Sequence, residues 1–364
     1  MSHPPIKLML VDDSALVRQT FCALFDAVDD IDVVAVAPDP YIAVEKLKKT
    51  VPDVILLDVE MPRMDGVTFL KKLMSQHPIP VIICSTLVGN THNADKSSTH
   101  MAALEAGAVD IITKPSVGIK QFAQDSATTL YDAVRAAANA RVKQVVKQTR
   151  QVQKLKADAV LERKPASAMH ETTEKIICIG ASTGGTEAIK AVLMRMPRDC
   201  PAIAIVQHMP EGFTASFAKR LNEQCAITVD ESKHGMSLLR GRAIIAPGNQ
   251  HMTIRRSGAK YYVDIKDGPL VSRHRPSVDV LFRSAANTVA SNASAVILTG
   301  MGDDGAAGLM ELKESGAATF AQDEKTSVVW GMPRVAYERG AAEKTVALDN
   351  VAAALLKASG YVSR

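Results

Sequence analysis

The 364-residue sequence predicts a doubly wound α/β domain and a second α/β domain, joined by a helical connector. Two observations lead to this fold class. Short apolar runs rich in β-branched residues alternate with helical patterns over about the first 120 residues, and a second pattern of this kind begins at Ile176. Apolar residues make up 47% of the chain and charged residues 23%, which excludes a disordered or fibrous protein.

Five apolar runs in the first part of the chain predict buried parallel strands. Between the first two runs, apolar residues recur at helical spacing from Leu16 to Val28 and form one stripe. Five such strand–helix units fit one small domain, which we place at residues 1–125. The predicted strands are Ile6–Val11, Asp32–Ala37, Val54–Leu57, Val81–Cys84 and Val109–Ile112.

Residues 126–174 have the composition of a connector. From Asp132 to Glu162 the chain contains no Gly or Pro and is rich in Ala, Val, Gln, Lys and Arg, which favours a helix. Its apolar residues are small and sparse, so we expect a partly exposed helix followed by a looser stretch over residues 164–173. A solvated spacer is a simpler interpretation of the basic residues than a docking surface.

The second domain is placed at residues 175–364. Its apolar runs predict strands, and helical patterns follow several of them. The predicted helices are Glu187–Met196, Phe213–Gln224, Val278–Val289 and Ala307–Glu314. The predicted strands are Ile176–Ile179, Ala202–Val206, Ala243–Ala246, Tyr261–Ile265 and Ala295–Leu298.

Charge and apolar content exclude several classes of protein. Net charge is −5 over residues 1–125, +4 over 126–174 and +5 over 175–364, so basic residues do not gather on one module as in a nucleic-acid binder. No apolar run approaches the roughly 18 residues of a membrane span, and the N-terminus does not read as a signal peptide. We expect a cytoplasmic protein without membrane insertion, whose five cysteines are reduced.

Charged and hydroxyl residues of the first domain fall where its strands end. Asp12 and Asp13 follow the first strand, Asp58 the third, Ser85 the fourth and Lys114 the fifth. The carboxyl edge of a parallel sheet is where such folds bind ligands. Three carboxylates gathered there would repel one another unless a hard divalent cation lay between them, and oxygen ligands suit Mg²⁺.

This set of residues also suits phosphoryl transfer. A carboxylate such as Asp58 can attack phosphorus and form an aspartyl phosphate. Mg²⁺ and the ammonium group of Lys114 would neutralise the charge on the transferring group. A hydroxyl at Ser85 could then hydrogen-bond to the new phosphate. Any one of these residues alone would be a solvated strand-end side chain, but all of them together predict a site.

The same residues, with LLDVEMPRMDG around the end of the third strand, resemble the receiver domain of two-component response regulators. The resemblance covers about residues 5–125 and implies a flavodoxin-like fold. It implies that Asp58 is the phosphoacceptor, that Asp12 and Asp13 hold the metal with it, and that Lys114 contacts the phosphate. Ser85 is then the switch hydroxyl, although Thr86 beside it leaves this assignment open.

A Gly-rich turn opens the second domain. KIICIGASTGGTEAIKAVLMRM reads as strand, turn and helix, with Gly180, Ser182 and Gly184 forming G-x-S-x-G. Backbone N–H groups at the start of the following helix are free donors that suit an oxyanion. The same turn could cradle a phosphate, although it lacks the lysine of a P-loop.

A histidine and two aspartates follow other strands of this domain. His208 comes after the run Ala202–Val206, and Asp303 and Asp304 come after Ala295–Leu298. A serine hydroxyl is a weak nucleophile, which needs a base within hydrogen-bond reach and an acid that holds the tautomer of the base. A lone histidine would more often be structural. Joined to the serine turn and a strand-end aspartate, it predicts a nucleophilic triad.

Six segments in order carry a second resemblance: GASTGG, QHM, IAPGNQHM, RHRPSVDVLFRS, LTGMGDDG and AQDEKTSVVWGMPR. They resemble the catalytic domain of the chemotaxis protein-glutamate methylesterases. A receiver joined by a linker to such a domain is the layout of that family. The resemblance implies a second doubly wound α/β domain, the methylesterase domain, with a mainly parallel sheet.

The site residues of that family carry over by motif position. Ser182 is the expected nucleophile, His208 the base and Asp304 the acid, with Asp303 as the alternative acid. The backbone N–H of Met301 is the expected oxyanion donor, and Thr183 is expected to position the site. Arg273, His274 and Arg275 are candidates for contact with an acidic substrate surface.

The resemblance implies a phosphorylation-activated hydrolase that demethylates glutamate methyl esters on methyl-accepting chemotaxis receptors, releases methanol and deamidates glutamines. A sensor histidine kinase would supply the phosphate, with Mg²⁺ in the receiver and no cofactor at the esterase site. The unphosphorylated receiver is expected to cover the Ser182 cleft.

The rival hypothesis is a non-catalytic response regulator whose second domain binds a nucleotide or a protein partner at the Gly-rich turn. It would need no His208 and would place an acidic ribose contact near residue 200, where Asp199 is a poor candidate.

Overall fold

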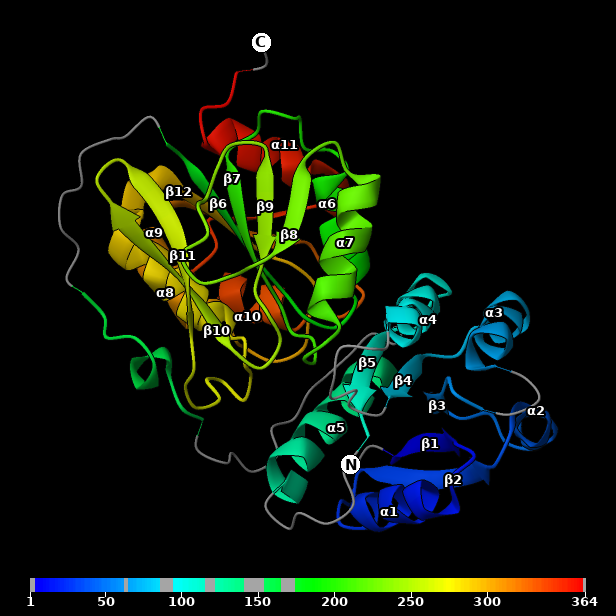
Figure 1. Cartoon of the computed structure of the whole chain (residues 1–364). Coiled ribbons are helices and arrows are strands. Elements are labelled where there is room, and N and C mark those ends of the chain that lie inside the picture. Colours follow the sequence, from blue (N-terminus) through cyan, green and yellow to red (C-terminus); the bar gives the residue numbers. More distant parts are fainter. Residues whose placement is uncertain are drawn as a thin grey trace. The chain divides into compact units, whose positions relative to one another are not determined.

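The chain folds into two compact units, Met1–Val145 and Val146–Arg364 (Figure 1). The computed structural model describes residues 4–61, 65–85, 94–114, 122–140, 154–164 and 174–362. Both units are α/β with parallel main sheets, so the predicted fold class is confirmed.

The first unit is built on a five-stranded parallel sheet with the order β2-β1-β3-β4-β5. The chain runs outward from β1 to β2 and returns past β1 to β3, so the strand order reverses between β1 and β3. Ligands of such sheets bind at the carboxyl ends of the strands that flank this point. The strands are β1 (Ile6–Val11), β2 (Ile31–Ala37), β3 (Val54–Asp58), β4 (Val81–Ser85) and β5 (Asp110–Thr113).

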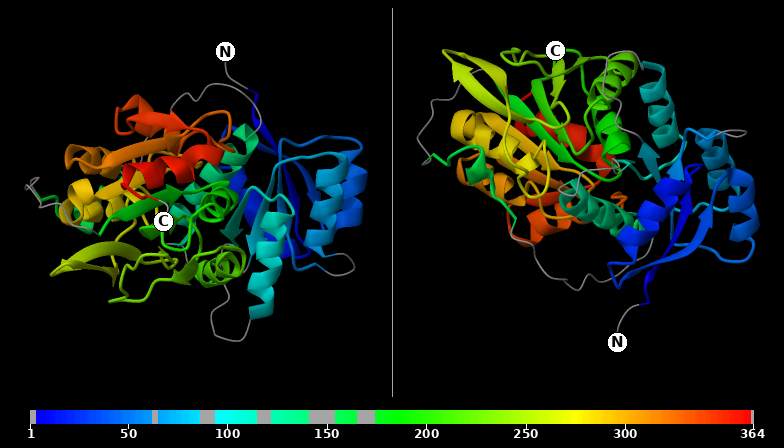
Figure 2. Two further views of the ribbon diagram at one scale, coloured as in Figure 1. Left: turned by 90° about the horizontal axis from the view of Figure 1, so that it is seen from above. Right: turned by 60° about the horizontal axis from the view of Figure 1, so that its bottom comes forward.

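Helices cover both faces of this sheet (Figure 2). The first and last helices, α1 and α5, pack together. The centroids of the Phe25 and Tyr131 rings lie 5.7 Å apart, and the Tyr131 hydroxyl donates to the Leu24 carbonyl at 2.7 Å. The third and fourth helices contact each other. The five are α1 (Ala15–Phe25), α2 (Pro40–Leu47), α3 (Gly66–Gln76), α4 (Ala94–Glu105) and α5 (Phe122–Asn139).

Helix α5 runs through residue 125, where the sequence placed the end of the domain. Leu130, Ala133, Val134 and Ala137 recur at helical spacing and are buried in the same core as Leu8. The core of the first unit therefore extends to Ala137, because small apolar residues on one helix face are enough to pack against the sheet.

The expected helix over Asp132–Glu162 does not continue into its last part. Beyond Ala140, which follows α5, the next described residues are 154–164, and the only helical element among them is the 3₁₀ turn Ala157–Ala159. Ala157 and Val160 pack against Val271 and Val280 of the second unit, to which this segment belongs. Tertiary contacts here override helix propensity.

The second unit is built on a seven-stranded parallel sheet with the order β14-β13-β12-β6-β7-β9-β8. Its strand order reverses between β6 and β12. A separate antiparallel hairpin, β10 (His251–Ser257) and β11 (Lys260–Lys266), contains the predicted strand Tyr261–Ile265. The strands of the sheet are β6 (Ile176–Ala181), β7 (Ala202–Gln207), β8 (Thr228–Glu231), β9 (Arg242–Ile245), β12 (Ala293–Ile297), β13 (Ala318–Gln322) and β14 (Lys344–Val346).

Two helical layers enclose the seven-stranded sheet (Figures 1 and 2). Helices α6, α7 and α11 form one layer and α8, α9 and α10 the other, and the hairpin packs on α8. Their bounds are α6 (Gly185–Leu193), α7 (Thr214–Gln224), α8 (Val278–Thr288), α9 (Ala306–Glu314), α10 (Met332–Glu338) and α11 (Leu348–Ala358). None of the helices in the described part of the chain combines the length and apolar character that a membrane crossing needs.

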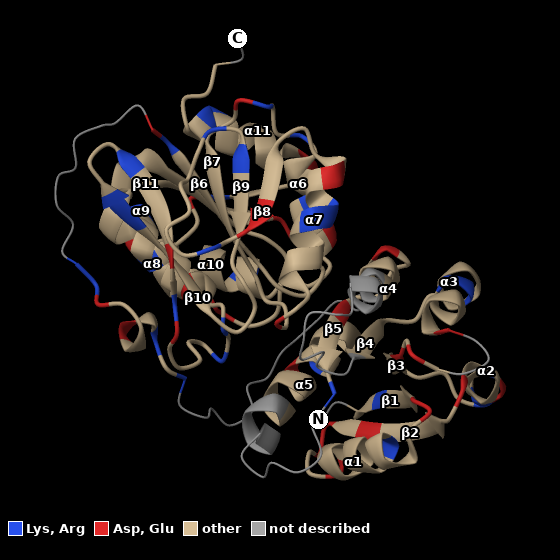
Figure 3. Cartoon of the chain, viewed as in Figure 1, with Lys and Arg blue, Asp and Glu red and all other residues tan. Residues whose placement is uncertain are grey.

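Charged side chains are spread over both units. Figure 3 shows basic residues of the second unit on β9, β11 and α7 and acidic ones on the neighbouring β8. Of the five cysteines, Cys84, Cys178 and Cys200 are buried and the other two are half-buried.

Candidate functional site

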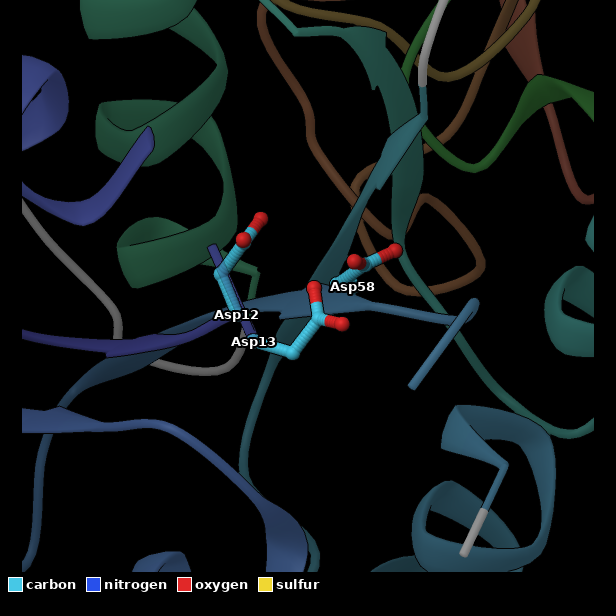
Figure 4. Close-up of side chains that lie close together, drawn as sticks. All are labelled: Asp12, Asp13 and Asp58. Atoms are coloured by element: carbon cyan, nitrogen blue, oxygen red, sulfur yellow. The ribbon is translucent and has the colours of Figure 1, made fainter. Parts of the chain in front are cut away.

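Three carboxylates meet at the carboxyl edge of the first sheet (Figure 4). Asp12 and Asp13 follow β1, and Asp58 ends the neighbouring strand β3, on either side of the point where the strand order reverses. One oxygen from each of the three lies within 4.8 Å of the others. Asp12 and Asp58 are buried and Asp13 is exposed. The arrangement matches the predicted one.

Lys114 joins this cluster from the end of β5. Its Nζ lies 2.7 Å from Asp58 Oδ2 and 2.8 Å from Asp12 Oδ2, and it is the only partner of that Asp12 oxygen among the described residues. Burial raises the pKa of Asp12 even though Lys114 opposes the shift, and Asp58 raises it further. Burial acts to lower the pKa of Lys114, but its two carboxylate partners outweigh that effect and raise it.

This donor set fits a hard divalent cation. All three residues offer carboxylate oxygens, which are the ligands of Mg²⁺. The buried Asp12 oxygen, which has a lysine as its one partner in the described structure, is the kind of atom that a cation would satisfy.

The predicted switch hydroxyl is placed only by its backbone. Ser85 ends β4 and pairs in register with Thr113, the residue before Lys114. The side chain of Ser85 and the whole of Thr86 lie outside the described residues, so the choice between the two hydroxyls stays a prediction.

Ser182 lies in the turn between β6 and α6. Its N–H donates to the Thr299 carbonyl at 3.0 Å, and its side chain is nearly buried, with 9% of the residue exposed. Gly184 has φ of 75°, which favours glycine, and it precedes the first residue of α6. Gly180 is required for packing. A Cβ at this position would lie 2.2 Å from the Val278 side chain, so the absence of a side chain allows the start of α8 to approach β6.

His208 follows β7 and faces Asp304. Its Nε2 lies 2.8 Å from Asp304 Oδ2, and both side chains are buried. Its Nδ1 is buried and has no partner among the described residues. With Nε2–H donated to the carboxylate, Nδ1 is the ring nitrogen left to act as a base. No hydrogen bond links Ser182 Oγ to this nitrogen within the described part of the chain, an arrangement that apo sites often show.

Asp304 is held by four donors. Oδ2 accepts from His208 and from the Val278 N–H at 2.7 Å, and Oδ1 accepts from the Ser277 hydroxyl at 2.8 Å and the Asp279 N–H at 3.0 Å. Burial acts to raise the pKa of Asp304, but the bond from His208 and the backbone N–H of Val278 outweigh it and hold that pKa below its ordinary value of 3.8.

Asp303 lies in a different environment. Its carboxylate pairs with Lys154 and, at 3.4 Å, with Arg339, and it is partly exposed. The structure therefore brings Asp304, and not Asp303, to His208.

The loop after β12 supplies the predicted oxyanion donor. A Cβ on Gly300 would lie 2.7 Å from the Ser182 Cβ, so this loop passes directly beside the serine. The N–H of the next residue, Met301, makes no hydrogen bond within the described structure. Thr183 is buried, and its carbonyl accepts from the Thr299 hydroxyl at 3.0 Å.

Two supporting residues were not predicted. Gln207 is buried, and its amide donates to the Ser182 carbonyl at 2.9 Å and to the His208 carbonyl at 3.1 Å. Ser277 caps α8 and also binds Asp304. A serine directly before the helical pattern of SVDVLFRS is an N-cap signal that could have identified Ser277.

Two residues of the segment 273–275, predicted to contact an acidic substrate surface, have partners within the second unit. Arg275 donates to the Gly268 carbonyl at 2.5 Å and to Asn249 Oδ1 at 2.6 and 3.1 Å, so its guanidinium is bound within the unit. The His274 ring stacks on His208. The ribose contact that the rival hypothesis needs is also unsupported. Asp199 precedes β7 and so lies at the amino edge of the sheet, whereas Ser182 follows β6 at the carboxyl edge. The Asp199 carboxylate accepts a hydrogen bond from the Tyr361 hydroxyl.

Comparison with known proteins follows the same division of the chain. A family model described as response regulator receiver domain matches residues 8–124, and one described as CheB methylesterase matches residues 177–355. A Geobacter metallireducens protein named protein-glutamate methylesterase/protein-glutamine glutaminase 3 is 55% identical over 98% of this chain and 99% of its own length. An Oleidesulfovibrio alaskensis protein named protein-glutamate methylesterase/protein-glutamine glutaminase 2 is 54% identical over 97% of this chain and 98% of its own length.

Among solved structures, the Thermotoga maritima CheB methylesterase catalytic domain is 35% identical, with a TM-score of 0.49, and the match covers 50% of this chain and 97% of that one. The similarity to the two curated relatives runs through both units.

Proposed function

Because this chain belongs to the CheB methylesterase family and carries a receiver domain, we propose that it is a phosphorylation-controlled protein-glutamate methylesterase and protein-glutamine glutaminase. Its substrates are glutamate methyl esters and certain glutamines of methyl-accepting chemotaxis receptors. The observation that carries this proposal is the buried His208–Asp304 pair at the carboxyl edge that also holds Ser182.

The ester chemistry is assigned to Ser182, His208 and Asp304. Ser182 Oγ attacks the ester carbonyl while Nδ1 of His208 takes its proton, and Asp304 stabilises the imidazolium through Nε2–H. The Met301 N–H stabilises the oxyanion beside Ser182, and Thr183 shapes the turn.

Collapse of the tetrahedral intermediate breaks the C–O bond, and the imidazolium protonates the departing methanol. Water, deprotonated by His208, then attacks the acyl-enzyme. The bond between the acyl carbon and Ser182 Oγ then breaks, the imidazolium of His208 returns its proton to Oγ, and the glutamate is released. A glutamine amide follows the same path with ammonia as the leaving group. The esterase site needs no cofactor for these steps.

Control is assigned to the first unit. Asp58 accepts a phosphoryl group from a sensor histidine kinase, and Lys114 contacts the phosphate because its ammonium already binds Asp58. Asp12, Asp13 and Asp58 would hold Mg²⁺, which when bound neutralises charge on the transferring group. Ser85 would report the phosphate through its hydroxyl.

The proposed setting is the cytoplasm, where the protein meets the cytoplasmic part of its receptors without inserting into the membrane or binding nucleic acid. We assign receiver function to residues 1–125, completed by the rest of α5, and catalysis to residues 175–364. Residues 126–174 then include both the end of α5 and the segment that packs on the catalytic unit.

Methanol release tests this proposal. The full chain is mixed with membranes that carry methyl-labelled receptors, with and without Mg²⁺ and a small-molecule phosphodonor. We expect labelled methanol in both cases and a faster release with the phosphodonor. Failure to release methanol under either condition would overturn the proposal. Release at the same rate with and without the phosphodonor would refute the proposed control by phosphorylation.

A further inference from the structure

The ring of His274 lies face to face with the ring of His208. The two ring centroids are 3.7 Å apart and the planes are inclined by 17°. This is a stacked arrangement at van der Waals contact, and His208 is the proposed base. None of the steps proposed above uses His274, which the sequence suggested only as a substrate contact.

A stacked ring supplies what the hydrogen bond to Asp304 lacks. That bond fixes one atom of His208, Nε2, at 2.8 Å from the carboxylate. The second side-chain torsion of histidine is broad, so one fixed atom still allows the ring plane to tilt. Contact across the ring face restricts that tilt, and with it the direction in which Nδ1 points.

The turn that carries His274 is firmly anchored. Val271 and His274 exchange backbone hydrogen bonds of 3.1 and 2.8 Å, and Ser272 and Arg273 adopt positive φ of 49° and 71°. The Ser272 N–H donates to the Leu155 carbonyl at 2.8 Å, and the side chain of Val271 is fully buried.

The strain of two such φ values is held in place by these contacts. The turn can therefore serve as a fixed support for the ring.

His274 remains neutral beside the base. Burial first, and the neighbouring His208 second, lower the pKa of His274 to about 3. A neutral ring adds no repulsion when His208 becomes an imidazolium, and it offers a polarisable face to that cation.

We propose that His274 is a positioning residue for the ester hydrolysis, whose flat ring holds the His208 imidazole in the plane that directs Nε2 to Asp304 and Nδ1 to the serine. The inference rests on the proposed hydrolase. It extends that proposal by a residue outside the triad and explains why the chain forms a strained turn at this point.

The test compares three substitutions in the full chain. His274→Ala removes the ring, His274→Leu fills the space without a flat face, and His274→Phe keeps a flat face without titratable nitrogen. We expect kcat for methanol release to fall about 10- to 100-fold in the Ala and Leu variants with KM within about 3-fold, because orientation of the base acts on the transition state. The Phe variant should recover kcat to within about 5-fold of the wild type.

His234→Ala serves as the matched control, because His234 is exposed and its Nε2 lies 3.8 Å from a carboxylate oxygen of Asp264. It should leave both constants unchanged. Should the Ala variant fail to fold, the Leu and Phe variants decide the question.

Equal losses in the Leu and Phe variants would overturn the stacking role. So would a rise in KM at constant kcat, which would make His274 a substrate contact. Absence of methanol release by the wild type would instead refute the proposed function.

Discussion

The two units place aspartates at equivalent points of two parallel sheets and surround them differently. In the first unit, Asp12 follows β1 where the strand order reverses, and its buried Oδ2 has Lys114 as its only partner among the described residues. In the second unit, Asp304 lies beyond β12 at the corresponding reversal and accepts four hydrogen bonds. Burial raises the pKa of Asp12, whereas the hydrogen bonds lower the pKa of Asp304 despite its burial.

This difference shows how the same edge of a fold supports two kinds of chemistry. A carboxylate with few hydrogen-bond donors is ready for a cation and for the charge of a phosphoryl group. A carboxylate saturated by donors is fixed in place and ionised, which is what the orienting acid of a triad requires. The partners of the aspartate, more than its position in the sheet, decide its role.

The largest effect is expected at the serine. Ser182→Ala should lower methanol release by about 10⁴ to 10⁶ while the protein stays folded, because it removes the nucleophile and little buried volume. Steady-state rates of the full chain would measure it. Ser257→Ala, at an exposed serine on β10, is the matched control and should have the wild-type rate. A Ser182→Ala protein with a tenth of the wild-type rate would exclude serine catalysis.

The two neighbouring aspartates sharpen the comparison within one loop. Asp304→Asn should reduce kcat by about 10⁴, since the amide cannot hold the tautomer of His208 that leaves Nδ1 free. Asp303→Asn should change kcat by less than about 3-fold, because its partners are Lys154 and Arg339 at the surface. Kinetics on the two variants would decide, and the opposite ranking would assign the acid to Asp303.

The smallest effect concerns stability of the first unit. The pKa of Asp12 is raised in the folded state, so its contribution to stability is present at low pH and is lost as pH rises through that folded pKa. Without Mg²⁺ at pH 7.5, Asp12→Asn should therefore raise the free energy of unfolding by about 1 kcal/mol.

Thermal melts with and without Mg²⁺ test this prediction. Mg²⁺ should stabilise the wild type more than the variant, and the exposed Asp13→Asn should raise metal-free stability less than Asp12→Asn does. Metal-free destabilisation by Asp12→Asn would contradict the argument.

Much of the fold could be predicted because its central strands are continuous apolar runs. Strands such as Ile176–Ala181 lie within buried β-branched segments. The edge strand Thr228–Glu231, with the sequence TVDE, was missed because half-exposed edge strands are short and polar. The 3₁₀ turn at Ala157 was read as helix because its shape depends on contacts with Val271 and Val280, which no local pattern records.

The site was predictable where each residue carries its own motif. Ser182 and His208 stand directly after strands, and Asp304 lies in the loop after β12, so topology brings all three to one edge. The choice of Asp304 over Asp303 depends on the start of α8, more than 20 residues away in the sequence. The stacking of His274 on His208 likewise depends on a turn with two positive φ angles in non-glycine residues, which the sequence does not mark.

The central claim is that one aspartate performs the switch and another serves the catalysis. The most direct test is the rate of methanol release by the wild type, Asp58→Asn and Asp304→Asn, each with and without Mg²⁺ and phosphodonor. We predict that Asp58→Asn keeps the basal rate and loses the stimulation, because the phosphoacceptor is gone and the triad is intact. Asp304→Asn should lose nearly all of both rates. Stimulation of Asp58→Asn by the phosphodonor, or a near-normal basal rate in Asp304→Asn, would contradict the account.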